Sequence, residues 1–326
     1  DFLNRKAFKN YLSLADARVN KAGIDWTNFV PVKPAQPGIH VLHQYPLDEI
    51  APYIDWTPFF ITWEMHGKFP GILSDEKIGT EATKLYNDAN ALLKKIVEEK
   101  WLQAEGVCGI WEASSKGDDD VEINTEKGNT TLHFLRQQIQ KAEGQRNVSL
   151  ADFIAPDVTD YMGAFAVTIK GIEPHLKQLE EQHDDYNKIM LQALADRLAE
   201  AFAELLHKKV RTEYWAYVNS ESLSNEELIK ESYKGIRPAP GYPACPDHTE
   251  KIKLFKLLNV QENIGIELTE SLAMYPAASV CGWYFANPES YYFGVGKITQ
   301  EQLEDYARRK EMDLDEATKW LRPILD

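Results

Sequence analysis

The residues best suited to bind a ligand lie between positions 236 and 251, in the stretch "IRPAPGYPACPDHTEK". Four prolines fall within nine residues, and each proline fixes φ and removes a backbone donor. Arg237 precedes them, and a guanidinium is planar, always charged and able to bind a carboxylate or phosphate through two hydrogen bonds. The stretch therefore predicts one of two structures. It is either a stiff loop that binds an anionic group, or a rigid connection into a helix capped by Asp247, with Arg237 in solvent.

Other polar clusters are less informative. Asp196, Glu200 and Glu204 recur every four positions, which places them on one face of a predicted helix, most simply a solvent-exposed face. Cys245 and His248 lie three positions apart, but no second Cys/His pair with ligand spacing accompanies them, so we predict no metal site. The glycine patterns of phosphate loops and dinucleotide-binding turns are also missing from the sequence.

Length and charge restrict the class of protein. The chain has 326 residues, enough for one large domain or two ordinary ones, and a formal net charge of −15. No apolar run reaches the ~18 residues of a membrane span, and the acidic charge disfavours nucleic acid and anionic membranes. Three cysteines, Cys108, Cys245 and Cys281, do not suggest a disulfide framework and favour a reducing cytoplasm. Because the chain lacks an initiator Met and an apolar signal core, we expect a piece of a longer protein.

The predicted elements alternate irregularly along the chain. Apolar residues spaced three and four positions apart predict helices over about 1–25, 80–100 and 182–214. Capping patterns predict further helix starts at Ser224, Asp247, Thr299 and Asp313. Aromatic and β-branched runs predict strands over 107–112, 120–124, 161–169, 278–285 and 291–296. This pattern predicts an α+β fold with an antiparallel sheet, in a single elongated domain over 1–326.

The proline-rich stretch closely resembles the S-adenosylmethionine-binding signature of the C-terminal reactivation domain of cobalamin-dependent methionine synthase. Other segments are similar to this family in the same order along the chain: "DWTPFFITWEM", "LRQQ", "SLADFIAP", "GAFAVT", "QHDDYNKIMLQALADRLAEAFAELLH", "LSNEELI", "LTESLAMYPAASVCGWYFANPES" and "EDYARRK". The resemblance covers nearly the whole chain. It implies a C-shaped α+β domain around a central twisted antiparallel sheet flanked by helices.

The resemblance also implies a function. In this family the domain binds S-adenosylmethionine and supplies its methyl group when cobalamin has oxidised to inactive cob(II)alamin, while flavodoxin or a flavoprotein reductase donates an electron. Cobalamin is carried by another domain of the parent enzyme, which moves methyl groups from methyltetrahydrofolate to homocysteine. The nucleophile is reduced cobalt, so we expect no catalytic side chain in this chain. The acidic helix face becomes a candidate docking surface for the cobalamin-binding domain.

Five positions of the chain match the ligand site of the family most directly. Arg237 matches the signature arginine and is expected to bind the carboxylate of the ligand. Asp55, in "IDWTPFF", matches the acid that binds the ligand's ammonium group. Gly241, Tyr242 and Ala244 fall in the part of the loop whose backbone contacts the ligand. From the residue types alone, Asp55 is better explained as an exposed or helix-capping acid, and the resemblance reverses that preference.

Three further residues complete the expected site. Tyr292, in "ESYYFGVG", matches a tyrosine of the family's ligand site, although by itself it reads as an ordinary strand aromatic. Phe293 stands where the family often has a second tyrosine, so a ring contact is expected there without a hydroxyl. Glu231 precedes the motif and is expected to face the same cleft. Two other functions stay open: a module that senses S-adenosylmethionine without using it, and a free-standing methyltransferase with its own acceptor. No pattern for an acceptor pocket or a base accompanies the second.

Overall fold

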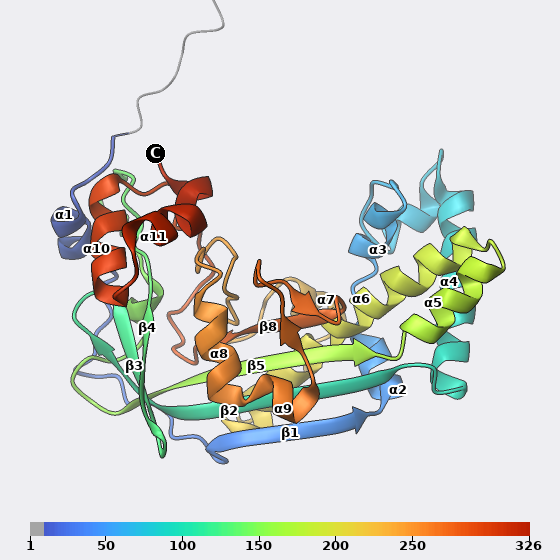
Figure 1. Ribbon diagram of the computed structural model, residues 1–326, viewed down its shortest axis with the longest axis horizontal. Helices are drawn as coiled ribbons and strands as arrows, with labels where there is room; N and C mark the ends of the chain where they lie inside the picture. The colour runs from blue at the N-terminus through green and yellow to red at the C-terminus, as the bar shows by residue number, and fades with distance from the viewer. Residues whose placement is uncertain (1–9) are drawn as a thin grey trace, which may run out of the picture.

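A six-stranded antiparallel sheet runs through the middle of the computed structural model, which describes residues 10–326 (Figure 1). Its strands follow the order β4-β3-β2-β5-β8, and β1 also pairs with β2. One edge of the long strand β2 pairs with β1 near the strand's start and with β3 near its end. The strands are β1 (Gly38–Tyr45), β2 (Gln103–Lys116), β3 (Asp120–Thr125), β4 (Gly128–His133), β5 (Asp160–Lys170) and β8 (Ser279–Tyr284). Two short strands, β6 (Glu267–Leu268) and β7 (Met274–Tyr275), pair separately.

Four of the five predicted strands are present, inside β2, β3, β5 and β8. The strand predicted over 291–296 is wrong. That segment lies against the proline-rich loop, and Val295 donates a hydrogen bond to the carbonyl oxygen of Pro243 (2.8 Å) instead of joining a ladder. Strand β4 was not predicted, because "GNTTLH" is polar over most of its length and its first two residues are exposed.

Eleven α-helices surround the sheet in the described part of the chain: α1 (Leu14–Val19), α2 (Leu47–Ile50), α3 (Thr57–Thr62), α4 (Gly79–Glu98), α5 (Glu173–Glu181), α6 (Asp185–Lys209), α7 (Asn225–Ile229), α8 (Glu250–Leu258), α9 (Val260–Ile264), α10 (Gln300–Lys310) and α11 (Leu314–Leu321). A π-helical turn, Val210–Tyr214, extends α6. Shorter 3₁₀ turns are Ala51–Tyr53, Gly71–Ser74, Leu150–Phe153 and Arg322–Ile324.

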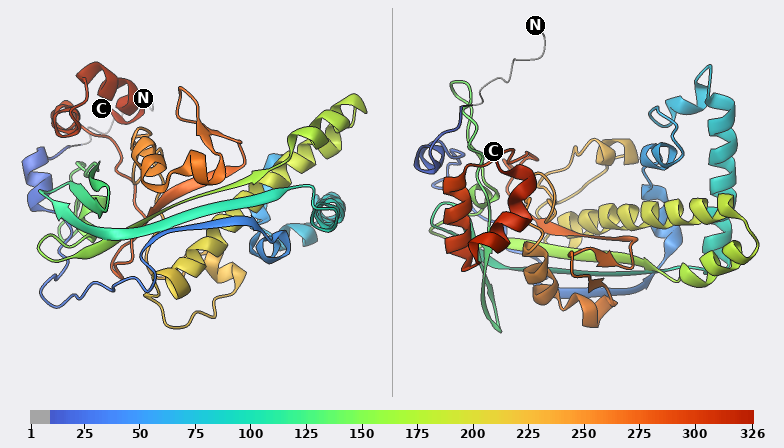
Figure 2. Two further views of the ribbon diagram at one scale, coloured as in Figure 1. Left: turned by 60° about the horizontal axis from the view of Figure 1, so that its bottom comes forward. Right: turned by 45° about the horizontal axis from the view of Figure 1, so that its top comes forward.

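The sheet is covered on both faces. Along β5, Phe165 and Val167 belong to the hydrophobic cluster that contains α6, whereas Ala164 and Ala166 belong to the cluster that contains α8 and α9. Successive side chains of a strand point to opposite faces, so β5 is buried throughout except at its last residue. Figure 2 shows α6 and α8 on opposite sides of the sheet. This burial fixes the position of β5, and with it the floor of the site described below.

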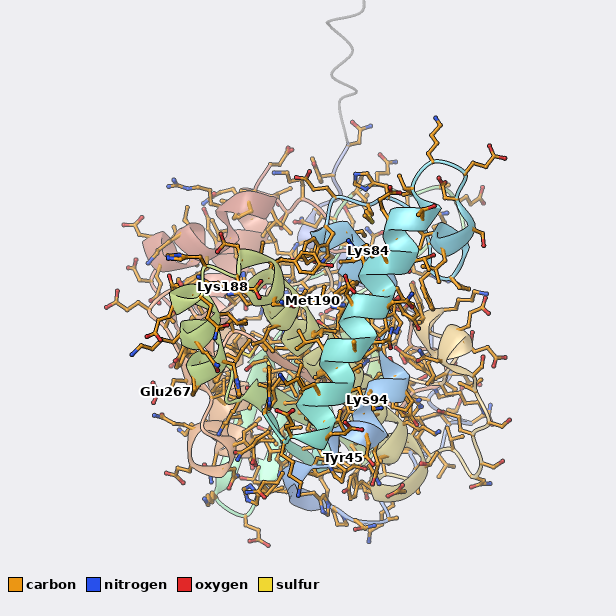
Figure 3. All side chains as sticks on the ribbon, turned by 90° about the vertical axis from the view of Figure 1, so that its right-hand side faces the viewer. Tyr45, Lys84, Lys94, Lys188, Met190 and Glu267 are labelled. Carbon is orange, nitrogen blue, oxygen red and sulfur yellow. The ribbon has the colours of Figure 1, made fainter. Side chains whose placement is uncertain are left out.

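The molecule has the C shape that the family resemblance implied. Helices α3, α4 and α5 rise at one end of the sheet, while α1, α10 and α11 rise with the β3–β4 hairpin at the other (Figure 1). Helix α4 confirms the helix predicted over 80–100: it buries Leu85, Ala89 and Leu93 and turns Lys84 and Lys94 to solvent (Figure 3). The open side between the two arms contains the proline-rich loop.

Several predicted helix starts are confirmed and one is wrong. Ser224 forms the predicted capping box with Glu227, and Asp313 caps α11. Asp247 does not cap α8, whose N-cap is Thr249. Instead Asp247 is buried, accepts the backbone N–H of Thr249 (2.8 Å) and forms an ion pair with Lys310 (2.6 Å). The Asp247 carboxylate therefore lies just before α8, where it pairs with the buried Lys310 instead of capping the helix.

The two long helices predicted at 1–25 and 182–214 have different outcomes. Of the helix predicted over the first 25 residues, positions 1–9 lie outside the described residues, and the rest contributes only α1. The helix predicted over 182–214 is α6 with its π-helical turn. Within residues 10–326, no helix has both the length and the apolar character needed to span a bilayer.

Candidate functional site

Two adjoining cavities lie on the open side of the molecule, and Glu200, Glu231 and Arg237 line both of them. The larger cavity has a volume of about 480 Å³ and lies between the proline-rich loop and β8. The smaller one has a volume of about 250 Å³ and lies between α6, α7 and the turn that carries Asp55. Pockets of this combined size hold small molecules and cofactors. The shared wall makes the two cavities parts of one cleft.

The proline-rich loop is held in place by its backbone. The carbonyl oxygen of Pro238 accepts the N–H of Trp283 (2.8 Å), which attaches the loop to β8. The N–H of Gly241 donates to the carbonyl oxygen of Cys245 (2.7 Å), and Gly241 has φ +92°. A Cβ there would lie 2.3 Å from the ring of His248, so the tight turn requires glycine. These bonds hold the loop in one conformation, as both interpretations of the sequence expected; binding of an anionic group by the loop stays a prediction.

The loop residues expected to contact a ligand are placed around the larger cavity. Tyr242 and Ala244 line this cavity; the Tyr242 residue is 63% exposed, whereas Ala244 is buried. Gly241 lies between two lining prolines and shapes the turn rather than the cavity wall. Burial raises the pKa of the Tyr242 hydroxyl, and the nearby Glu200 adds to this effect. The exposed ring of Tyr242 is thus available to cover a bound molecule.

Arg237 is not the solvent-exposed arginine of the alternative interpretation. Its side chain is 19% exposed, and Nη2 donates to Oε2 of Glu204 at 2.7 Å. Its backbone N–H donates to the hydroxyl oxygen of Tyr292 (2.9 Å). Burial lowers the pKa of the guanidinium, but Glu204 and the neighbouring tyrosines raise it more, so the group stays charged. Its Nε is buried and has no hydrogen-bond partner in the described structure. The exposed part of the Arg237 guanidinium lies at the junction of the two cavities, where its charge is available to an anionic group.

Asp55 lies on the other side of the smaller cavity, in the turn between the 3₁₀ turn and α3. Pro58 is in the first turn of α3, where its missing N–H is no loss. One oxygen of Asp55, Oδ1, accepts the N–H of Thr57 at 2.9 Å. The alternative of a capping acid is thus partly right, since this bond supports the start of α3. It occupies one carboxylate oxygen and leaves the carboxylate half-buried in the cavity wall.

The acidic stripe on α6, which is the helix face formed by Asp196, Glu200 and Glu204, lies partly in solvent and partly in the cleft. Asp196 is exposed, Glu200 is half-buried and lines both cavities, and Glu204 is 8% exposed and pairs with Arg237. The simplest expectation from the sequence, a solvent-exposed acidic face, is therefore wrong for Glu200 and Glu204. Both line the smaller cavity because α6 forms its wall, and one helical turn separates the two residues.

Glu231 adds a fourth carboxylate, from a strained backbone position. It follows the C-cap of α7, has φ +56°, and lines both cavities. Partial burial of its carboxyl raises its pKa, and Glu204 raises it further, while Arg237 opposes both. Together, four carboxylates face the guanidinium groups of Arg197 and Arg237 in the smaller cavity, so its lining is net acidic.

Tyr292 and Phe293 both line the larger cavity. The Phe293 ring packs edge-on against Phe153 (ring centroids 6.3 Å apart), so it forms a fixed apolar wall. The Tyr292 hydroxyl is shared: it accepts from the backbone of Arg237 and lies 3.0 Å from the hydroxyl oxygen of Tyr233. Tyr233 was not predicted as a site residue. Its proximity to the motif was the one signal in the sequence, and that signal does not distinguish it from its neighbours.

The arrangement suits a zwitterion that carries an additional cation and a ring system. The partly exposed guanidinium of Arg237 fits a carboxylate, and the surrounding acids fit cationic groups. The larger cavity offers aromatic and proline faces together with backbone groups of the loop. Within residues 10–326, no group of three or more His, Cys, Asp or Glu side chains is placed to hold a metal ion.

Comparison with known proteins agrees with this description. The family model "Vitamin B12 dependent methionine synthase, activation domain" matches residues 46–311. The chain belongs to this family. Among solved structures, the MetH reactivation domain bound to AdoHcy is 49% identical, with a TM-score of 0.93 over 97% of this chain and 98% of the other.

The family assignment confirms the resemblance stated from the sequence, and with it the fold. As an activation domain of methionine synthase, the chain is part of a methyltransferase. The match of 46–311 includes every predicted site residue, from Asp55 to Phe293. It also includes Glu204 and Tyr233, which line the smaller cavity and were not predicted as site residues.

Proposed function

We propose that this activation domain binds S-adenosylmethionine in the cleft and presents its methyl group for the reductive remethylation of cob(II)alamin. The observation that carries the proposal is the shared wall of the two cavities, where the partly exposed guanidinium of Arg237 lies among carboxylates. S-adenosylmethionine has a carboxylate, an ammonium group and a sulfonium, and this wall offers a partner of opposite charge for each. The solved relative was crystallised with AdoHcy, which is the same molecule without the transferred methyl group.

Each predicted residue then has a specific task. Arg237 binds the ligand carboxylate, and Asp55 binds the ammonium group across the smaller cavity. Glu200 and Glu231, which line both cavities, stabilise the sulfonium by their charge, since a sulfonium has no N–H to donate. The adenosine part occupies the larger cavity, between the loop backbone at Gly241–Ala244 and the rings of Tyr292 and Phe293.

The cobalt reaches the methyl group from outside this chain, because cobalamin is carried by a separate domain of the parent methionine synthase. Flavodoxin or a flavoprotein reductase supplies the electron, in the cytoplasm. The contribution of this chain is to position and to stabilise charge, without a catalytic acid or base. Asp196, the exposed member of the acidic stripe, remains the candidate contact to the cobalamin-binding domain.

Binding and turnover should therefore separate in a reconstitution assay. The chain alone should bind S-adenosylmethionine and transfer no methyl group to homocysteine. Adding a cobalamin-loaded module and reduced flavodoxin should produce methylcobalamin, which is detected by its absorbance. Methylation of homocysteine by the chain alone would show a free-standing methyltransferase. Binding without any methylcobalamin, with an active cobalamin module present, would show a sensing module.

Asp196 can be tested in the same assay. Asp196→Lys should slow remethylation and change its salt dependence without altering ligand affinity, because Asp196 does not line the cleft. The control is Asp185→Lys at the far end of α6, which is also exposed. Equal rates for the two variants would remove the acidic stripe from the docking surface.

A further inference from the structure

Behind the cleft lies a second set of polar residues that the proposed function does not use. It consists of Tyr233, His207, Arg211 and Glu221, and three of the four lie on α6, its π-helical extension or the segment that follows. His207 and Arg211 are fully buried, and Tyr233 is 9% exposed. Buried polar groups are costly unless they are paired, so a cluster of this kind next to a ligand site requires a reason.

The ring of Tyr233 is held from two sides. The guanidinium carbon of Arg211 lies 4.4 Å from the ring centroid, and the ring of His207 meets it edge-on at 4.8 Å. Arg211 is itself fixed by Glu221, with Nε and Nη2 each donating to one carboxylate oxygen at 2.6 Å. The π-helical turn Val210–Tyr214 carries Arg211, and such turns are frequent at functional sites. These contacts leave the ring little freedom to rotate.

The hydroxyl of Tyr233 is directed at the cleft. Its oxygen lies 3.0 Å from the hydroxyl oxygen of Tyr292. The Tyr292 oxygen in turn accepts a hydrogen bond from the backbone N–H of Arg237, at 2.9 Å. Burial raises the pKa of the hydroxyls of Tyr233 and Tyr292, so both stay protonated at neutral pH. An oxygen held by two hydrogen bonds is fixed in place, whichever tyrosine donates to the other.

We infer that Tyr233 is a positioning residue of the cleft: its hydroxyl fixes Tyr292, and Tyr292 fixes the backbone from which the Arg237 side chain extends. Glu204 fixes the other end of that side chain, through Nη2. The Arg237 side chain is then held at both ends, and the part of its guanidinium that lines the two cavities keeps one direction. On either side of Arg237 the backbone is bonded to β8 and the residue after it, through Ile236 with Phe285 and through the carbonyl oxygen of Pro238 with Trp283, so the Arg237 N–H is the backbone donor at this point that is left for Tyr292.

Hydrogen exchange of the Arg237 amide tests the positioning without any ligand. Exchange is followed at the single Arg237 amide by NMR, because a peptide over residues 234–240 would also report the amides of Lys234, Gly235, Ile236 and Ala239. Tyr292→Phe removes the acceptor and should speed exchange most. Tyr233→Phe should speed it by about 2- to 10-fold, the loss of one hydrogen bond. Unchanged exchange in Tyr233→Phe would overturn the inference.

The effect on the ligand rests on the proposed function, and a pair of ligands separates the two. Tyr233→Phe should weaken binding of S-adenosylmethionine about 3- to 10-fold, and should leave binding of the decarboxylated analogue within about twofold, because that analogue does not use Arg237. Equal losses for both ligands would show a general structural role and overturn the inference. No binding of either ligand by the unmodified chain would overturn the proposed function, whatever the exchange experiment shows.

Tyr284→Phe is the matched control. The Tyr284 ring stacks on the same His207 (ring centroids 5.1 Å apart), it is fully buried, and its hydroxyl has no hydrogen-bond partner among the described residues. Removing this hydroxyl should change neither the exchange of the Arg237 amide nor the affinity for either ligand. If Tyr284→Phe has the same effects as Tyr233→Phe, then the loss of any buried hydroxyl near α6 explains the data, and the bond to Tyr292 is irrelevant.

Discussion

Replacing Arg237 by alanine should damage the protein in two separable ways. Arg237→Ala removes the donor proposed for the ligand carboxylate, and it also leaves Glu204 without its partner. The Glu204 residue is 8% exposed and lies near Glu231, so its unpaired charge is poorly solvated and repelled. A loss of ligand binding in this single variant would therefore not show by itself that Arg237 touches the ligand.

The expected magnitudes follow from the burial of the pair. Breaking a buried ion pair by removing one partner costs about 3–5 kcal/mol, and this pair retains exposures of 19% and 10%. We therefore expect the free energy of unfolding to fall by about 2–3 kcal/mol. Loss of a buried charged contact to the ligand costs at least about 2 kcal/mol, and each 1.4 kcal/mol is a factor of ten, so affinity for S-adenosylmethionine should fall at least about 30-fold.

A double-mutant cycle separates the two effects. Arg237→Ala with Glu204→Gln leaves a neutral pair, so the free energy of unfolding should return to within about 1 kcal/mol of the unmodified protein. Binding should not recover, because the donor is still missing. Urea unfolding gives the first quantity and isothermal titration calorimetry the second. If the double variant regains affinity together with stability, Arg237 acts through the fold and does not bind the carboxylate.

The remaining predictions concern three carboxylates. Asp55→Asn should weaken binding of S-adenosylmethionine more than binding of an analogue without the amino group, measured by calorimetry; equal losses would mean a structural role through Thr57. Glu231→Gly should raise the free energy of unfolding by roughly 0.5–1 kcal/mol, because φ +56° strains an L-residue, whereas Glu231→Ala should not raise it. Both variants should weaken binding of S-adenosylmethionine. A stability gain shared by the two would refute the role of strain. Burial raises the pKa of Asp160 from 3.8 to about 6, against the effect of two backbone N–H groups that donate to it. The folded state then binds this proton at a pH where the unfolded state does not, so the free energy of unfolding should gain about 2 kcal/mol from this group as pH falls from 7 to 4. Asp160→Asn should remove this gain in urea titrations, whereas the exposed control Asp157→Asn should keep it. An unchanged pH dependence in Asp160→Asn would contradict the raised pKa of Asp160.

The features that the sequence predicted are those with local causes. Helix α4 has a regular apolar spacing, and the proline-rich loop is stiff because of the ring structure of proline, whatever surrounds it. Most strands were predicted because they are buried apolar runs. The location of Asp55 in the same cavity as Arg237 has no local cause. No local pattern joins two residues so far apart in the sequence, and the family resemblance alone suggested that they lie in one site.

The errors arose where tertiary contacts override local patterns. Asp247 has the spacing of a helix cap, but the buried Lys310 is a stronger partner for its carboxylate. The segment 291–296 is aromatic like a strand, but it packs on a loop and has no strand to pair with. Glu204 interrupts the apolar run "AFAELLH", and a charge in such a run indicates a buried pair. That signal was present, but the partner, Arg237, could not be named without the fold.

The most direct test of the central claim is a crystal structure of this chain with S-adenosylmethionine. We predict that the ligand carboxylate lies within hydrogen-bond distance of the Arg237 guanidinium, that the ammonium group faces Asp55, and that the adenine ring occupies the larger cavity beside Tyr242 and Tyr292. Electron density for the ligand elsewhere on the surface would contradict the account. So would a ligand in the cleft with its amino-acid end turned away from Arg237.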